Sequence, residues 1–434
     1  MAHYDESSLD DSYNAIKEML KEDAEAVYLS GCGESVLELF RQAVRHIVSA
    51  SDKDSIGQKR SIDIISEADA LHDFAQESLL LYRYKDVPPC WRLLVMDACL
   101  LKAASLLDCL RQSTDIFQTQ RMAREIIKVI DTAMIVSGSP GQRRREVSHK
   151  VVDLLQDWLS ADRQLLQQFD KFDNIKRQKV VKVNSAKRVW LLNNAPDFLW
   201  FVNYIQSPRP APFIVPSGSI DHWPARSSRP WSSMAYLVSV AGDRIVPVEI
   251  GSQYTDANWQ QKLMRFEDFI RNHILHQAPN GPAYLAQHDL FHQIPRLADD
   301  INVPDYCYAS PPITDLYERP PTPDVIRNAW FGPGGTISPL HHDPYHNFLA
   351  QVVGSKYIRL YAPEQSKYLY PLDGILSNTS QVDVENIDKE RFPLADKAEY
   401  IECVLKAGEM LYIPPKWWHY VRSLETSFSV SFWF

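Results

Sequence analysis

The stretch that decides the fold is residues 330–361, which read WFGPGGTISPLHHDPYHNFLAQVVGSKYIRLY. Short apolar runs alternate here with polar residues, and glycine and proline separate the runs, which is typical of β-strands joined by tight turns. Residues 407–421, AGEMLYIPPKWWHYV, have the same character. Both stretches predict strands of one β-rich domain.

A candidate metal site lies inside these two stretches. His341 and Asp343 are two positions apart, so on a strand their side chains project from the same face while His342 faces away. His419, just before the last strand, supplies a third ligand. Two imidazoles and one carboxylate on one face of an octahedron leave positions open, as iron(II) requires to bind a keto acid and dioxygen. Zinc, which favours closed cysteine sites or histidine-rich hydrolytic sites, fits this pattern less well.

After about residue 196 prolines and aromatic residues accumulate, and alternating apolar runs replace the helical period. In the last run, Phe428, Val430 and Phe432 fall on one face of the predicted strand. We expect one helix, from Trp259 to His276, to interrupt a barrel or sandwich. The predicted strands are Val246–Ile250, Lys356–Tyr361, Glu409–Ile413 and Ser427–Phe434.

The chain from about Asp11 to Gln168 is helical in pattern, with apolar residues three and four positions apart, as in 35–49 and 147–160. Loops are expected at 31–33, 87–90 and 137–141, where glycine or proline interrupts the pattern. The apolar run Leu93–Leu110 contains charged residues and is interpreted as a buried helix, so no membrane span is expected. This half is interpreted as a scaffold or a surface for a protein partner.

A basic run divides the two halves and has two interpretations: a nuclear-import or chromatin-contacting linker, or a solvated surface segment. The predicted domains are therefore a helical domain (1–170), a basic linker (171–190) and a catalytic domain (191–434, with its core at about 280–434). The basic residues are Lys171, Lys176, Arg177, Lys179, Lys182, Lys187 and Arg188.

Composition excludes several classes of protein. The net charge of −9 over 434 residues gives no overall basic excess, so direct binding to nucleic acid is not expected. The polar, acidic N-terminus lacks the features of a secretory signal. The six cysteines form no CxxC pair, which indicates reduced core residues in a nuclear or cytoplasmic protein.

The C-terminal half resembles the JmjC oxygenases, most narrowly the JmjC arginyl hydroxylases, which also carry the names lysine-specific demethylase and histone-tail peptidase. The resemblance implies an α+β protein: an all-α N-terminal domain followed by a double-stranded β-helix (a cupin-like JmjC fold). It rests on AWFGPGGTISPLHHDPYHNF (329–348), KYIRLY (356–361), NTSQVDVEN (378–386) and WHYVRSLETSFSVSFWF (418–434).

The resemblance also implies the cofactors, which are Fe(II) held by His341, Asp343 and His419, 2-oxoglutarate as co-substrate, and O2. Lys356 would form a salt bridge with the distal carboxylate of 2-oxoglutarate, since a dicarboxylic acid inside a barrel needs a cation. Tyr284, Ser338 and Asn347 would hydrogen-bond around it. An alternative interpretation of Lys356 is a surface lysine at a strand end.

For the substrate, the resemblance points to Glu249 and Tyr254, with aromatic walls from Trp259, Trp330 and Trp433. A carboxylate beside aromatic rings suits a guanidinium, which accepts π-stacking on its face and donates paired hydrogen bonds from its edge. Without the resemblance, these tryptophans would be interpreted as barrel core.

The expected reaction is hydroxylation of an arginine side-chain carbon in a protein, with release of succinate and CO2. The enzyme is expected to be a monomer located in the nucleus, with the cytoplasm as the second candidate compartment. Demethylation of N-methyl-lysine in a histone and histone-tail peptidase activity, both implying a chromatin role, remain open as alternatives. So does a partner-binding scaffold without catalysis. His342 and His346 also lie near the site; His342 has the wrong strand parity, and His346 is expected to be a supporting or surface residue, while His288 is expected to be structural.

Overall fold

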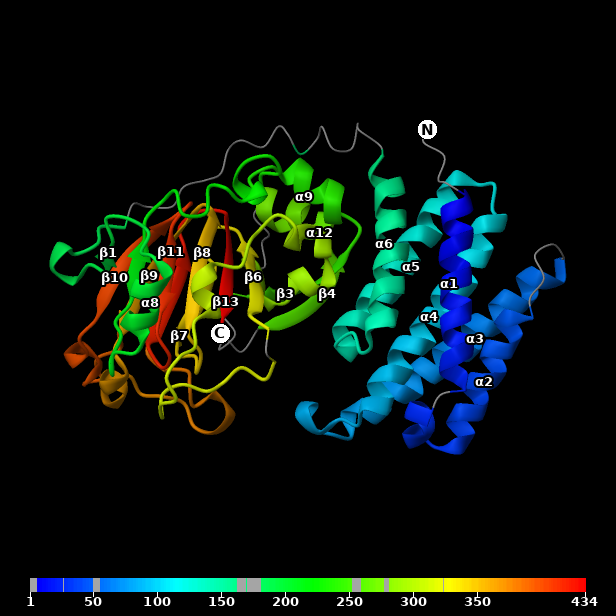
Figure 1. Cartoon of the computed structure of the whole chain (residues 1–434), viewed down its shortest axis with the longest axis horizontal. Helices are drawn as coiled ribbons and strands as arrows, with labels where there is room; N and C mark the ends of the chain where they lie inside the picture. The colour runs from blue at the N-terminus through cyan, green and yellow to red at the C-terminus, as the bar shows by residue number, and fades with distance from the viewer. Residues whose placement is uncertain are drawn as a thin grey trace. The chain divides into compact units, whose positions relative to one another are not determined.

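The structure, a computed structural model, describes residues 6–25, 27–49, 55–161, 169, 181–251, 259–276, 281–322 and 324–434. The chain forms two compact units (Figure 1). The first contains residues 1–167 together with Val238–Ile245 and Arg265–Glu267, and the second contains the remainder. Two short segments from the second half of the sequence thus belong to the helical unit, which the predicted boundaries did not include.

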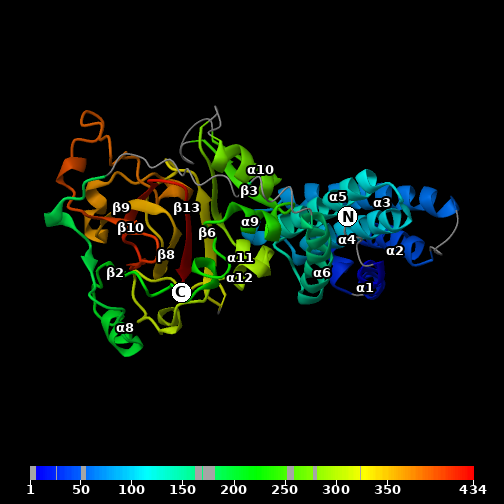
Figure 2. The same cartoon turned by 90° about the horizontal axis from the view of Figure 1, so that it is seen from above.

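The helical unit is organised around one buried helix, α4. This helix begins at Pro89, where proline's fixed φ and missing N–H are tolerated, and it is buried on nearly all sides. It packs against α1, α3 and α5 and runs between them in both views (Figures 1 and 2). The helices are α1 (Glu6–Ala24), α2 (Glu34–Val48), α3 (Ser55–Leu80), α4 (Pro89–Gln112), α5 (Ile116–Ser137) and α6 (Gln142–Ser160).

These helices confirm the helical pattern and its predicted breaks. Asp115 caps α5 by accepting a hydrogen bond from the N–H of Phe117 at 2.9 Å. The same helix ends before Gly138, whose φ of 75° is the left-handed conformation that glycine adopts without strain. The predicted buried helix over Leu93–Leu110 is the central part of α4.

A buried ion pair holds the segment Val238–Ile245 in the helical unit. Arg244 donates to Asp131 on α5 at 2.7 Å, and both side chains are 0% exposed. The second carboxylate oxygen of Asp131 accepts from the backbone N–H of Ile245 at 2.8 Å. Because the carboxylate is paired with a guanidinium and a backbone donor, its charge can be buried.

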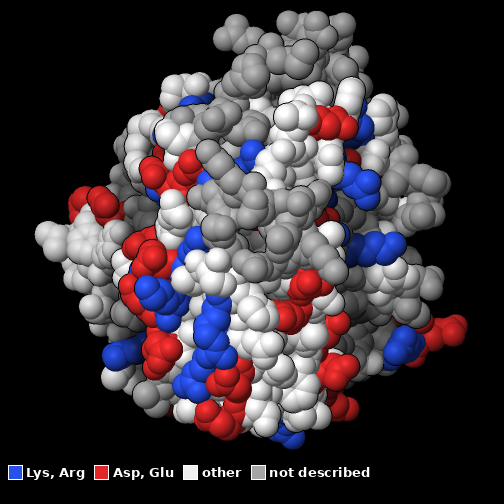
Figure 3. Space-filling view, turned by 90° about the vertical axis from the view of Figure 1, so that its right-hand side faces the viewer, with Lys and Arg blue, Asp and Glu red and all other residues white. Residues whose placement is uncertain are grey.

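Positive and negative side chains are interspersed on the face drawn in Figure 3, and the described residues form no continuous basic area on that face. This arrangement agrees with the net charge of −9. Of the basic run, Lys171, Lys176, Arg177 and Lys179 lie outside the described residues. Its role as an import signal therefore stays a prediction.

The second unit contains two sheets. The larger has the order β1-β2-β11-β8-β13-β6-β5-β3-β4, and the smaller has the order β10-β9-β12-β7 (Figure 1). Its strands are β1 (Trp190–Leu191), β2 (Phe213–Val215), β3 (Ile245–Ile250), β4 (Gln260–Arg265), β5 (Ala283–His288), β6 (Ile326–Gly332), β7 (Ile337–His341), β8 (Asn347–Val353), β9 (Ser355–Tyr361), β10 (Ile401–Lys406), β11 (Met410–Ile413), β12 (Trp418–Ser423) and β13 (Ser427–Trp433).

Apolar side chains from both sheets meet in one core. Leu349 and Leu411 from the larger sheet pack with Ile358, Leu405 and Val421 from the smaller one. The two sheets therefore enclose a common interior, which is the double-stranded β-helix that the resemblance implied.

The last strand, β13, shows why the alternating pattern was a reliable guide. Phe428 stacks on Phe331 at 4.7 Å, while Ser429 on the opposite face donates to Gln351 at 2.9 Å. Both faces of β13 are buried, so the apolar face packs and the serine face forms hydrogen bonds. All four predicted strands are confirmed within a residue at their ends.

The predicted helix from Trp259 to His276 is wrong in its first half. Residues Gln260–Arg265 form β4, which lies beside β3 at the edge of the larger sheet, and helical structure begins only at Phe266. Pairing with a neighbouring strand overrides the local helical period here. The remainder is α10 (Phe266–Phe269) followed by a π-helical turn over Ile270–Leu275.

Short helices complete the second half of the chain: α8 (Phe198–Ile205), α9 (Met234–Ala241), α11 (Leu290–Gln293) and α12 (Pro295–Ala298). Among the described residues, no helix combines the length and the apolar character needed to cross a membrane. All six cysteines are free thiols, and only Cys109 is not fully buried, which confirms the prediction of reduced cysteines.

The buried pair in the helical unit gives a stability prediction. Replacing Arg244→Met leaves the Asp131 carboxylate buried without its cation, and should lower the free energy of unfolding by about 3–5 kcal/mol. Urea denaturation followed by circular dichroism measures the effect. The control is Arg45→Met, which removes an exposed ion pair with Glu38 and should cost less than about 1 kcal/mol. Equal effects of the two substitutions would contradict the assignment.

Candidate metal centre

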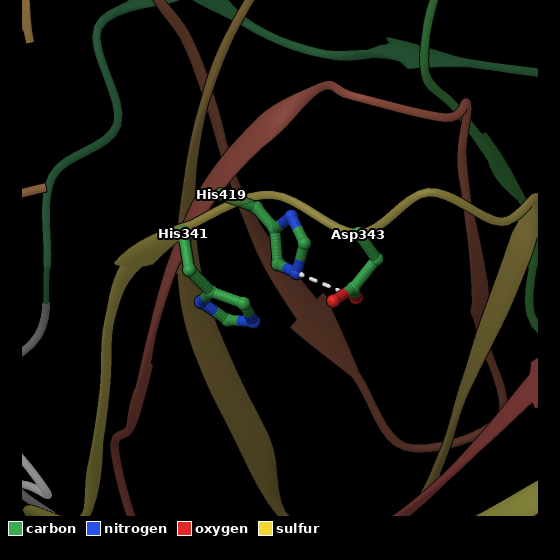
Figure 4. A group of neighbouring side chains, drawn as sticks. All are labelled: His341, Asp343 and His419. Carbon is green, nitrogen blue, oxygen red and sulfur yellow. Dashed lines mark ion pairs between the residues drawn. The ribbon is translucent and has the colours of Figure 1, made fainter. Parts of the chain in front are cut away.

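Two of the three predicted ligands meet through strand pairing. Strand β12 runs antiparallel to β7, and their register sets His419 directly opposite His341. Cross-strand partners have neighbouring side chains, and the two imidazole centroids lie 4.2 Å apart. Figure 4 shows both rings on the same side of the sheet.

Asp343 reaches the same point from a loop. Strand β7 ends at His341, so the expectation that both residues lie on the strand is wrong in detail. The backbone carbonyl of Asp343 accepts from the N–H of Lys416 at 2.7 Å, which ties its loop to the turn before His419. Its carboxylate lies 3.6 Å from Nε2 of His419 (Figure 4).

Backbone carbonyls orient both imidazoles. Nδ1 of His341 lies 2.7 Å from the carbonyl of Pro339, and Nδ1 of His419 lies 3.0 Å from that of Trp417. Each Nδ1–H therefore donates to a carbonyl, which leaves Nε2 as the ligand atom. Burial, followed by the nearby His341, lowers the pKa of His419 to about 4, so its ring is in the neutral form that metals bind.

The donor set fits a ferrous ion. One ligand atom from each of His341, Asp343 and His419 lies within 4.8 Å of the others, and no other group of this kind occurs in the described part of the chain. Two imidazole nitrogens and one carboxylate oxygen on one side leave the opposite side open for further ligands.

The neighbouring histidines have other surroundings. His342 packs edge-on against Trp418 with centroids 4.6 Å apart, and burial lowers its pKa to about 4. The expectation that His346 could lie at the surface is wrong, because it is 3% exposed and Nδ1 contacts the hydroxyl of Tyr412 at 2.8 Å. His288 contacts Gln293 at 2.6 Å, in keeping with a structural role.

A buried lysine lies in the cavity that contains the metal ligands. Lys356 on β9 is 1% exposed, so the alternative of a surface lysine is wrong. Its Nζ donates to the hydroxyl of Tyr284 at 3.0 Å. Burial lowers the pKa of Lys356 to about 7 and raises that of the Tyr284 phenol. Ser338 and Asn347 also line this cavity, so the structure brings all four residues together with the metal ligands.

Polar atoms without a hydrogen-bond partner indicate which kind of ligand this cavity can bind. Oδ1 of Asn347 and Nε1 of Trp433 are buried and have no hydrogen-bond partner among the described residues. Buried polar atoms without partners are costly, and so is a buried ammonium without an anion. The ammonium of Lys356 and the indole N–H of Trp433 can donate to the carboxylates of a small dicarboxylic acid, whereas Oδ1 of Asn347 can only accept a hydrogen bond. The residues present therefore fit 2-oxoglutarate.

A second, wider cavity of about 270 Å³ contains Glu249 and reaches His341 and Asp343. Burial raises the pKa of Glu249, and the nearby indole N–H of Trp259 lowers it in part. This N–H forms no hydrogen bond that meets the geometric criteria with a described acceptor. Trp330 lines both cavities and donates to Ser431 at 3.0 Å.

The other predicted substrate residues are placed differently. Trp433 lines the metal cavity, and Trp259 lies beside Glu249 but is not a wall of either cavity. Tyr254 lies outside the described residues. The structure thus brings Glu249, Trp330 and Trp433 to the metal centre from three strands.

Three polar residues on the wall of the wider cavity were not predicted from the sequence: Gln287, Asn378 and Thr379. Asn378 forms two contacts with His342, donating from Nδ2 to its carbonyl at 3.1 Å and accepting from its N–H at 2.9 Å through the backbone. Gln287 has a φ of 47° at an irregularity in the pairing of β5 with β6. The motif NTSQ contained a signal for Asn378, whereas nothing local marks Gln287.

Known proteins match either about half of this chain or most of it. Residues 199–434 match the family described as a cupin-like domain. Lysine-specific demethylase 8 of Danio rerio is 40% identical over 373 residues, which cover 84% of this chain and 86% of that protein.

Two further relatives match mainly one half. Lysine-specific demethylase 8 of Xenopus tropicalis is 53% identical over 51% of this chain and 47% of its own length. Lysine-specific demethylase JMJ30 of Arabidopsis thaliana is 52% identical over 51% of this chain and 49% of its own length. With the family match over more than half of the sequence, these relatives show that the chain belongs to the cupin-like JmjC family of Fe(II)- and 2-oxoglutarate-dependent oxygenases.

Proposed function

We propose that this oxygenase acts on a cationic protein side chain, and specifically that it hydroxylates a side-chain carbon of arginine. The observation that carries the proposal is the partly buried carboxylate of Glu249 in the cavity that reaches His341 and Asp343. When bound, Fe(II) and 2-oxoglutarate together activate dioxygen for insertion of one oxygen atom into a C–H bond, with release of succinate and CO2.

The residues of the chain would position the reactants. His341, Asp343 and His419 would hold the metal and leave its opposite side open. Lys356 would fix the distal carboxylate of 2-oxoglutarate through a charge-assisted hydrogen bond. The indole N–H of Trp433 would donate a further hydrogen bond to the co-substrate, and Asn347 lines the same cavity.

Glu249 would select the substrate. No described cationic side chain forms an ion pair with it, and burial already raises its pKa, so a cation that enters the cavity would relieve the cost of burying this carboxylate. Trp330 beside it offers an aromatic face. Guanidinium uses both features, since its edge donates paired hydrogen bonds and its face stacks on rings.

The second candidate is demethylation of N-methyl-lysine, which follows when hydroxylation of an N-methyl carbon releases formaldehyde. The names of three relatives support it, and they support it better than they support arginine hydroxylation. The site supports it less, because a trimethylated ammonium has no N–H to donate to Glu249.

The metal ligands give the first prediction here. His341→Ala should abolish stoichiometric Mn²⁺ binding, measured by calorimetry, and reduce succinate formation with Fe(II) and 2-oxoglutarate to the background rate. His222→Ala, at an exposed histidine, is the control and should retain both. Undiminished succinate formation after His341→Ala would remove the metal centre from the proposal and favour a scaffold role.

Lys356 gives a prediction for pH. Its pKa of about 7 means that, above this pH, binding of 2-oxoglutarate must take up a proton, so affinity should fall about tenfold for each pH unit above 7. Calorimetry with Mn²⁺-loaded protein between pH 7 and about 9 measures the slope. Lys356→Arg, which stays charged, should bind with no such slope, and a slope unchanged by this substitution would contradict the assignment.

The lowered pKa of Lys356 also affects the stability of the unliganded protein, which should rise with pH although the affinity for 2-oxoglutarate falls. Between pH 7 and the pKa of an unfolded lysine near 10.5, the unfolded chain binds a proton at this position that the folded chain has lost. The unliganded protein should therefore become more stable as pH rises through this window.

The substrate prediction separates the two candidate reactions. Glu249→Gln should lower kcat/KM for an arginine peptide by about 10- to 100-fold, because the charged acceptor is lost, while KM for 2-oxoglutarate stays unchanged. The exposed Glu390→Gln is the control. Mass spectrometry identifies the product: a gain of one oxygen atom on arginine supports the proposal, and loss of a methyl group from lysine as formaldehyde supports the second candidate instead.

A further inference from the structure

The turn Gly374–Leu376 contributes to the wall of the wider cavity, which also contains Glu249. Leu376 lines this cavity and is still 45% exposed, so it lies where the cavity opens to solvent. Ile375, directly before it, is 99% exposed. Single apolar side chains are common on a protein surface, but two in succession beside a cavity are a candidate contact for a ligand. Ile375 and Leu376 are called the apolar lip below.

Hydrogen bonds tie the apolar lip to the strand of a metal ligand. The backbone N–H of Thr379 donates to the carbonyl of Leu376 at 2.8 Å. Thr379 also pairs with His341 in an isolated β-bridge, and the N–H of Ser380 donates to the carbonyl of Leu340 at 2.8 Å. The lip is therefore held in position relative to the metal centre. A contact surface that is already in position loses little conformational freedom when a ligand binds to it.

The wall of the wider cavity has a polar part and an apolar part. The polar part includes Glu249 with the metal ligands His341 and Asp343, and the apolar part includes Ile337 and Leu376. A single cationic side chain that enters towards Glu249 uses only the polar part. In a polypeptide, the next residue lies one Cα–Cα step of about 3.8 Å away, so its side chain falls near the mouth of the cavity. An apolar side chain there would cover Leu376.

We propose that the apolar lip selects polypeptide substrates in which an apolar residue stands directly before or after the target arginine, an inference that rests on the proposed function. The side chain of this neighbouring residue packs on Ile375 and Leu376 while the target side chain enters towards Glu249. Such packing removes apolar surface of both partners from water, and contact with one leucine side chain is enough to change affinity about tenfold. The lip thus determines which arginine residues are bound, without contacting the reacting atoms.

The test measures peptide binding to the full chain loaded with Mn²⁺ and 2-oxoglutarate, using calorimetry, so that no turnover is needed. The two peptides, acetyl-GLRLG-amide and acetyl-GSRSG-amide, share a central arginine and differ only in its neighbours. The leucine peptide should bind about tenfold more tightly than the serine peptide. Ile375→Ser combined with Leu376→Ser should reduce this preference to less than about twofold, because the apolar contact is lost.

The matched control is Ile313→Ser combined with Leu394→Ser. These side chains are 88% and 38% exposed, and neither lines the wider cavity. The control protein should keep the full preference for the leucine peptide. Urea denaturation should give similar stabilities for both double variants, since all four substituted side chains are exposed. Glu249→Gln should weaken binding of both peptides by the same factor and leave the preference unchanged.

Two results would overturn the role of the lip alone. One is equal affinity of the unmodified protein for the two peptides, and the other is a preference that persists in the lip variant or is lost equally in the control. In both cases the arginine peptides still bind, so the proposed function stands. Binding of neither peptide would overturn the proposed function and the role of the lip together.

Discussion

The metal centre depends on one antiparallel pairing, that of β7 with β12, which sets His341 opposite His419. Side chains alternate with a period of two along a strand, so a slip of one residue would turn either imidazole to the other face of the sheet. The pairing of β7 with β12 is irregular between His419 and Val421, whereas β12 pairs with β9 without interruption, with the buried Val421 opposite the buried Ile358. Packing energy thus holds a geometry that the two histidines could not maintain alone.

Two of the buried cationic side chains among the described residues, Arg244 and Lys356, have different surroundings. Arg244 has its carboxylate partner, Asp131, within the helical unit, and its charge is satisfied by the fold. Among the described residues, Lys356 forms a hydrogen bond with the phenol of Tyr284 but no ion pair, and burial lowers its pKa. A cation that the fold leaves without an anion indicates a binding site, whereas a cation that the fold pairs indicates structure.

Sequence reasoning succeeded where local pattern and tertiary environment agree, as in β13, where alternation alone identifies both faces. His341, Asp343 and His419 were also predicted, because two histidines and an aspartate in this pattern are typical of a metal site. Sequence reasoning failed for Gln260–Arg265, where pairing at a sheet edge overrides the helical period. It also missed Gln287, because a positive φ at an irregular strand pairing depends on the neighbouring strand and leaves no mark on residue type.

The wall between the metal cavity and a neighbouring cavity, which is lined by His346, Pro414 and Trp417 among others, follows from the same alternation. Asn347 lines the metal cavity while the preceding His346 lines the other, and Ile413 and Pro414 divide in the same way. Adjacent residues of an extended segment necessarily face opposite sides. The turn after Ile413 also contains Trp417, which lines the neighbouring cavity and whose carbonyl orients His419. A residue of the neighbouring cavity thus contacts a metal ligand directly. One extended wall therefore presents two chemically distinct surfaces.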